Sequence, residues 1–63
     1  MIFTYQGVRC ALVDGVISYK GPRGLFKLSE VLFIEKANYT VVKIAKSEYQ
    51  EGVTLVTVER NIV

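Results

Sequence analysis

The sequence predicts a small all-β protein, an antiparallel meander of five or six strands that forms a barrel or a curved sheet. Residues that favour strands, namely Val, Ile, Thr, Phe and Tyr, make up 26 of the 63 residues, whereas Ala occurs only three times. Gly and Asn interrupt the chain at short intervals, as the turns of an antiparallel meander require. A chain this short has room for one small domain, here residues 1–63.

The first half of the chain is expected to form three strands. Their expected ranges are 2–6, 8–13 and 16–20. Gly7 ends the first strand, and Asp14 and Gly15 separate the second from the third. A two-residue hairpin needs a positive φ at both central residues, which Asp tolerates and Gly adopts freely. The sequence therefore predicts a tight β-hairpin at this Asp-Gly pair.

The middle of the chain fits two structures. Leu25, Leu28 and Leu32 recur at a helical spacing, which leaves open one short helix over Leu25–Glu30. Against this, residues 31–34 form a continuous apolar run, which suits a strand buried on both faces. The β-branched content and the flanking turns favour a strand for this second half.

Proline, glycine and asparagine predict the remaining turns. Residues 21–24, Gly-Pro-Arg-Gly, are expected to form a turn or a flexible hairpin tip, because Pro fixes φ at the second position of a turn. Ala37 and Asn38 are expected to form a two-residue turn, since Asn tolerates the left-handed conformation. The last two strands are expected at 39–46 and 53–59, with a polar loop between them.

The apolar content predicts self-association. The chain is 51% hydrophobic with a mean hydropathy of +0.31, and small domains have a high ratio of surface to volume. Several expected strands have apolar residues on both faces, so one face fills a core and the other is available for contact. We expect a homo-oligomer. No apolar run approaches the length of a membrane span and the N-terminus lacks a basic signal region, so a cytoplasmic protein is expected.

The residue inventory argues against an enzyme. The chain has no His and a single Cys, Cys10, so it offers no intrachain disulfide and no Cys/His zinc site. The usual base near neutral pH is therefore missing. Cys10 lies between Val8 and Leu12, where a buried, inert thiol is the expected state. We expect no catalysis, no metal and no cofactor.

A basic and aromatic cluster at the expected hairpin tip is the candidate binding site. Its residues are Tyr19, Lys20, Arg23, Phe26 and Lys27. Cations can neutralise phosphates and aromatic rings can stack on bases, which is the combination that single-strand binders use. The sequence thus suggests a non-enzymatic regulatory protein that binds nucleic acid. The alternative for this segment is a solvated hairpin end that keeps the sheet edge soluble.

A second function fits the same composition. A bacterial or mobile-element adaptor or inhibitor would bind a protein partner through an apolar sheet face. This function would use apolar side chains instead of the basic cluster.

Two stretches resemble known families. Residues 28–44, LSEVLFIEKANYTVVKI, resemble the opening strands of LytTR-type DNA-binding domains, in which an apolar strand ending in Ile-Glu is followed by Asn-Tyr and an alternating strand. This resemblance covers about a quarter of the chain and implies DNA binding. Residues 14–17 and 28–34 are similar to the strand pattern of bacterial PH-like domains, which implies an interaction module. Neither resemblance assigns a site residue.

Overall fold

The computed structural model describes residues 1–62, which contain six β-strands and one short 3-10 helix. The predicted all-β class is confirmed. The strands are β1 (Ile2–Tyr5), β2 (Val8–Val13), β3 (Val16–Lys20), β4 (Val31–Ile34), β5 (Ala37–Lys46) and β6 (Val53–Arg60). The 3-10 helix, η1, covers Arg23–Leu25. Each predicted strand is present: β2, β3 and β4 have the predicted bounds, and one end of β1, β5 and β6 differs by one or two residues.

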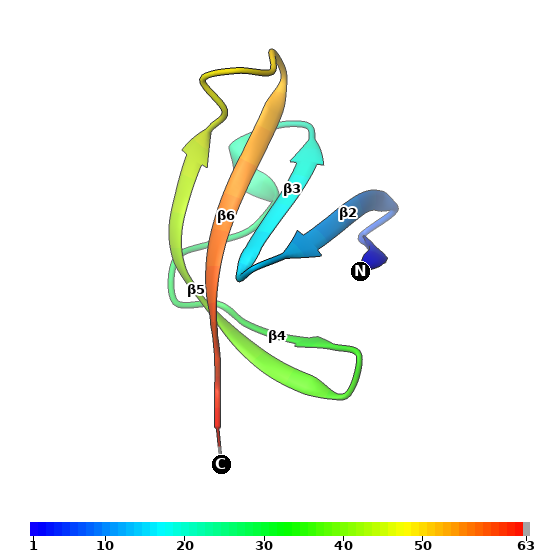
Figure 1. The fold of residues 1–63 in the computed structure, drawn as a ribbon, viewed down its shortest axis with the longest axis vertical. Coiled ribbons are helices and arrows are strands. Elements are labelled where there is room, and N and C mark those ends of the chain that lie inside the picture. Colours follow the sequence, from blue (N-terminus) through cyan, green and yellow to red (C-terminus); the bar gives the residue numbers. More distant parts are fainter. Residues whose placement is uncertain (63) are drawn as a thin grey trace.

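The six strands form one antiparallel sheet that curves into a nearly closed barrel (Figure 1). The strand order is β1-β2-β3-β6-β5-β4. Each half of the chain is a three-stranded meander, and the two meanders join where β3 pairs with β6. The predicted meander is therefore correct within each half. Residues 21–24 form no hairpin tip, because β3 pairs with β6 and not with the next strand, β4. Residues 21–30 instead lead from one half to the other through the turn η1, and β1 and β4 become the two edges of the sheet.

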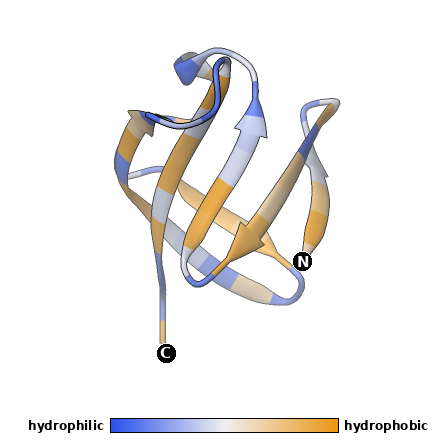
Figure 2. Ribbon diagram, turned by 45° about the horizontal axis from the view of Figure 1, so that its top comes forward, coloured by the Kyte–Doolittle hydropathy of each residue, from blue (hydrophilic) through white to orange (hydrophobic). Residues whose placement is uncertain are grey.

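Side chains that point into the barrel form the core. The buried apolar residues are Cys10, Leu12, Ile17, Tyr19, Phe26, Leu32, Ile34, Val41, Val56 and Val58. They alternate along each strand with outward-facing residues, because successive side chains of a strand point to opposite faces. Figure 2 shows this alternation as hydrophobic bands separated by more polar ones. Cys10 is buried, as the sequence predicts.

The hairpin turn between β4 and β5 corrects one prediction. Asp14 and Gly15 form the predicted β2–β3 turn with positive φ angles of 51° and 77°. The β4–β5 turn, however, consists of Glu35 and Lys36, with φ angles of 50° and 69°, and not of residues 37–38. A turn at 37–38 would pair Leu32 with Lys43 inside the barrel. The observed register pairs Leu32 with Tyr39, so burial of apolar side chains selects the turn.

The middle segment forms no α-helix over Leu25–Glu30. Only the 3-10 turn η1 is helical there, and Leu28 is exposed instead of packing on the core. The backbone N–H of Lys27 donates a 2.9 Å hydrogen bond to Oε1 of Glu30, which fixes a turn before β4. β4 itself is buried on one face only, because it is an edge strand and its residues Val31 and Phe33 point outward.

A β-bulge at Val42 changes which side chains of β5 point into the barrel. Val41 pairs with Val58, but Lys43 pairs with Thr57, so Val42 is the extra residue. Regular alternation would place Lys43 on the same face as Val41, inside the barrel. The bulge turns Lys43 outward and brings Ile44 opposite the buried Val56.

Candidate functional site

The segment that follows β3 is held in place by hydrogen bonds at one end of the barrel. The Tyr19 hydroxyl donates to the carbonyl oxygen of Pro22 at 2.5 Å, and the Thr54 hydroxyl donates to the carbonyl oxygen of Gly21 at 2.8 Å. The backbone N–H of Gly21 also donates to the carbonyl oxygen of Gly52 at 2.9 Å. These bonds join the end of β3 to the start of β6 and fix the turn that precedes Arg23.

The two aromatic residues of the predicted site lie in the core. Tyr19 is 3% exposed and Phe26 is 1% exposed. The Phe26 ring stacks on Tyr5, with centroids 4.6 Å apart, and packs against Tyr19 at 5.5 Å. Burial raises the pKa of the Tyr19 hydroxyl above its ordinary value. Since neither ring has an exposed face, the expected stacking on bases does not fit their positions in this structure.

The three cations of the predicted site are exposed, and Lys20 and Arg23 lie at this end of the barrel. Lys20 ends β3, Arg23 begins η1, and Lys27 follows in the segment that crosses to β4. The structure therefore divides the predicted cluster. Its cations face solvent, and its aromatic rings fill the barrel end beneath them.

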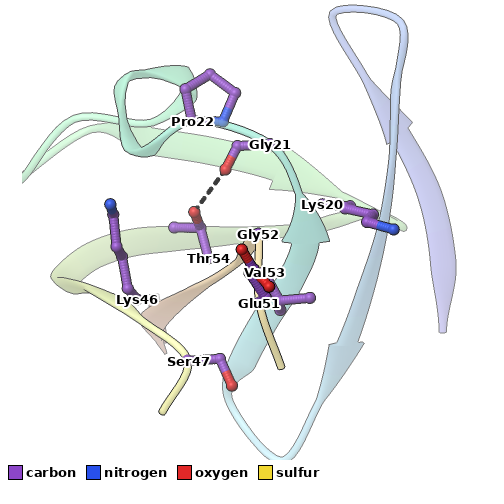
Figure 3. Close-up of a pocket in the computed structure, with 9 residues that line it drawn as sticks. All are labelled: Lys20, Gly21, Pro22, Lys46, Ser47, Glu51, Gly52, Val53 and Thr54. Carbon is purple, nitrogen blue, oxygen red and sulfur yellow. Dashed lines mark hydrogen bonds between the residues drawn. The ribbon is translucent and has the colours of Figure 1, made fainter. Parts of the chain in front are cut away.

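A pocket of about 510 Å³ opens beside this turn. Its lining comes from the β3–η1 turn, the end of β5, the loop after it and the start of β6, namely Lys20, Gly21, Pro22, Lys46, Ser47, Glu51, Gly52, Val53 and Thr54. In Figure 3, Lys20 and Lys46 lie on opposite sides of this group and their ammonium ends diverge. Glu51 contributes a carboxylate to the same pocket, so its wall contains both signs of charge.

Sequence reasoning missed three residues at this end. Lys46 is the last residue of β5 and pairs with Thr54 beside the pocket. Arg9 is exposed and lies beside Lys20. The neighbouring residues in the two strands, Cys10 and Tyr19, form a cross-strand pair between β2 and β3. Tyr49 is 93% exposed in the β5–β6 loop. An aromatic residue within a run of Ser, Glu, Gln and Gly was the signal for Tyr49, since such a loop has no core to fill.

The loop that holds Tyr49 has local order. The Ser47 hydroxyl oxygen accepts hydrogen bonds from the backbone N–H groups of Tyr49 at 3.2 Å and Gln50 at 3.1 Å. A hydroxyl that bonds nearby backbone groups in this way stabilises a turn. The exposed ring of Tyr49 is thus attached to a backbone held close to the pocket.

Charge is distributed unevenly between the two ends of the barrel. Four of the eight Lys and Arg residues, namely Arg9, Lys20, Arg23 and Lys46, lie around the end with the pocket, and Lys27 follows in the segment that leads from η1 to β4. Glu48 and Glu51 share that end, and Glu30 lies just before β4. The Glu30 carboxylate already accepts hydrogen bonds from the Tyr5 hydroxyl and the Lys27 backbone. We call the five cations the basic end.

Two further kinds of site, a metal site and a reactive cysteine, find little support in the described residues. Within residues 1–62, no group of three or more Cys, Asp or Glu side chains is placed to hold a metal ion. Cys10 is 1% exposed, and burial raises the pKa of its thiol, which disfavours the reactive thiolate.

Comparisons with protein-family models, curated proteins and solved structures find no match to this chain. The resemblances to LytTR-type and PH-like domains therefore rest on the sequence stretches alone. None of the helices among the described residues has the length and apolar character needed to cross a bilayer.

Proposed function

We propose that this protein binds single-stranded nucleic acid through its basic end, without catalysing a reaction, and acts as a small regulator by that binding. The observation that supports the proposal most is that four cations, with Lys27 in the adjoining segment, lie around one end of a barrel whose chain has a net charge of only +2. Clustered Lys and Arg side chains attract phosphates and release counterions when they bind them.

The fixed turn supports a direct role for Arg23. Its backbone follows a segment held by the hydroxyls of Tyr19 and Thr54, so little ordering is needed when the guanidinium meets a phosphate. Arg also binds phosphate with two parallel hydrogen bonds, which Lys cannot do. Lys20, Lys27 and Lys46 then contact neighbouring phosphates as point charges.

Tyr49 takes the stacking role first expected of Tyr19 and Phe26. It is the exposed aromatic residue beside the pocket, and a base can stack on its free face. Phosphate contacts and stacking are nearly independent of sequence, so we expect little discrimination between bases.

Fluorescence anisotropy with labelled single-stranded oligonucleotides tests this proposal. Binding is expected at low salt and is expected to weaken steeply as salt is raised, with a log–log slope of about 0.7 per phosphate contact. The double variant Arg23→Ala/Lys27→Ala should lower both the affinity and this slope. DNA and RNA of the same sequence should bind similarly, because both present the same phosphates.

A matched control separates the site from net charge. The double variant Lys36→Ala/Arg60→Ala removes two cations from the opposite end of the barrel and changes the net charge equally. It should bind like the wild type. Equal losses in both double variants, or no binding of the wild type at low salt, would overturn the proposal.

Glu51 provides a test in the opposite direction. Its carboxylate lines the pocket with Lys20 and Lys46 and repels phosphate there. Glu51→Gln should tighten binding several-fold at low salt, whereas Glu35→Gln, in the turn at the opposite end, should not. Unchanged binding of Glu51→Gln would place the phosphates away from this pocket.

Protein binding is the second candidate function, and exposed apolar side chains on β4 favour it. Val31 is 61% exposed and Phe33 is 70% exposed. Val31 and Phe33 lie on β4, away from Lys20, Arg23 and Lys46 at the other end of the chain's strands, so Phe33→Lys would impair protein binding without weakening oligonucleotide binding. A loss of oligonucleotide affinity in Phe33→Lys would contradict that separation.

A further inference from the structure

β4 presents an apolar face next to an open backbone edge. Val31 and Phe33 point outward, while Leu32 and Ile34 point into the core. Hydrogen bonds from Ser29 N to Val41 O at 2.8 Å and from Val41 N to Glu30 O at 2.9 Å fasten the preceding segment to β5. The exposed side chains of Leu28 and Val42 flank these bonds. We call Leu28, Val31, Phe33 and Val42 the β4 patch.

The backbone of β4 has free hydrogen-bonding groups. In an antiparallel pair, hydrogen-bonded and non-bonded residue pairs alternate. The bond from Val41 to Glu30 fixes the phase, so Leu32 and Ile34 are the β4 residues that bond to β5. The N–H and C=O groups of Val31 and Phe33 therefore point away from β5, along an edge that ends the sheet.

We propose that a second copy of this chain pairs with β4 across a two-fold axis, forming an antiparallel β4–β4 dimer. With the axis at Leu32, Val31 lies opposite the partner's Phe33, and Phe33 lies opposite the partner's Val31. Both residues with free backbone groups then exchange two hydrogen bonds each, four in total. Their exposed side chains also meet on one face as aromatic and β-branched pairs, a favourable cross-strand combination.

Other registers satisfy the edge less well. A shift by two residues in either direction leaves Val31 opposite the partner's Glu35, or Phe33 opposite the partner's Ser29. The register centred on Leu32 contains no charged residue within β4, so no like charges face each other. The edge is thus complementary to itself in one register, and this favours a second copy over an unrelated protein as its occupant.

The short strand limits the strength of the dimer. Four residues cannot bury the roughly 1,600 Å² of a standard protein interface. We therefore expect the dimer to form at high protein concentration and to dissociate on dilution. A two-fold pairing also closes on itself and stops at two chains, whereas pairing of β4 with the partner's β1 would continue into longer assemblies.

Sedimentation equilibrium over a wide concentration range tests the dimer without any oligonucleotide. The wild type should show a monomer–dimer equilibrium. Phe33→Glu should remain a monomer, with an unchanged circular dichroism spectrum because the replaced side chain is mostly exposed. Tyr49→Glu, which alters an equally prominent aromatic residue far from β4, should associate like the wild type.

A charge-pair experiment tests the register. Val31→Lys and Phe33→Glu should each be monomeric alone. When they are mixed, a heterodimer should form, because Lys at 31 of one chain faces Glu at 33 of the other. A wild type that stays monomeric at every concentration, assemblies larger than a dimer, or a mixture that does not associate would each overturn the proposal. Failure of oligonucleotide binding would leave it unaffected, since the β4 patch contains no cation of the basic end.

Discussion

The hydroxyl of Tyr5 donates a hydrogen bond to the carboxylate of Glu30, joining the end of β1 to the residue that precedes β4. These two strands are the edges of the sheet, so the bond closes the barrel where no backbone pairing does. The ring of the same tyrosine stacks on Phe26. One side chain thus connects the edges and covers the core beneath the basic end.

Removing this hydroxyl should destabilise the protein. Tyr5→Phe is expected to lower the free energy of unfolding by about 2 kcal/mol, because a hydrogen bond to a charged group contributes about 1.5–3 kcal/mol. Urea unfolding followed by circular dichroism measures this change. Tyr49→Phe is the control, since its hydroxyl lies on a side chain that is 93% exposed. Equal unfolding midpoints for Tyr5→Phe and the wild type would contradict a stabilising role for the bond.

Alkaline pH should weaken the fold through two tyrosines. The hydrogen bond to Glu30 and burial raise the pKa of Tyr5 above its ordinary value of 10.0, and burial raises the pKa of Tyr19. Around and above that pH the folded chain therefore holds more protons than the unfolded chain, so stability falls as pH rises. The contribution is complete below pH 10.0 and is lost as pH passes through the raised folded values.

The same Tyr5→Phe variant tests this pH dependence. Its urea midpoint should fall less between neutral pH and pH values above 10.0 than the wild-type midpoint does, because one of the two shifted groups is gone. Deprotonation of lysines affects both proteins alike. Parallel falls in the two proteins would show that Tyr5 does not contribute to the alkaline transition.

Two glycines should respond oppositely to alanine. Gly15 has a φ of +77°, and an added Cβ would lie 3.4 Å from the carbonyl oxygen of Val58. Gly15→Ala is therefore expected to destabilise the protein by about 1–2 kcal/mol. Gly24 lies in η1 without a positive φ, and an added Cβ meets nothing within 4 Å. Gly24→Ala should stabilise the protein by about 0.4–1 kcal/mol, by restricting the unfolded chain. Thermal unfolding measures both changes, and an unchanged melting temperature for Gly15→Ala would contradict a strained left-handed conformation at residue 15.

Local signals predicted the strands but not all of their registers. The Asp14–Gly15 pair and period-two alternation were sufficient for the first three strands. The turn at Glu35 and Lys36 lacks Gly and Asn, and its place depends on which residues of β5 enter the core. The bulge at Val42 depends likewise on pairing with β6, far along the chain.

The candidate site was only partly visible in the sequence for the same reason. Turn chemistry around Pro22 correctly indicated exposed cations at Lys20 and Arg23. The burial of Phe26 depends on Tyr5, which is distant in sequence and meets it only when β1 and the crossing segment come together. No local pattern distinguishes an aromatic residue that fills a barrel end from one that faces solvent beside it.

Phe26 should therefore contribute to the stability of the fold, and Tyr49 to oligonucleotide binding. Phe26→Ala is expected to lower the free energy of unfolding by about 3–5 kcal/mol, as for other large core residues. Tyr49→Ala should change it by less than about 0.5 kcal/mol, because the side chain is exposed. Urea unfolding measures both changes.

Oligonucleotide binding should show the reverse order. Tyr49→Ala is expected to weaken binding by about 1–3 kcal/mol, the contribution of one stacked base. Phe26→Leu, a milder change that keeps an apolar side chain at the barrel end, should bind like the wild type as long as it is folded. If Phe26→Leu lost affinity while Tyr49→Ala kept it, bases would have to reach the ring beneath the turn, and the crossing segment would have to open on binding.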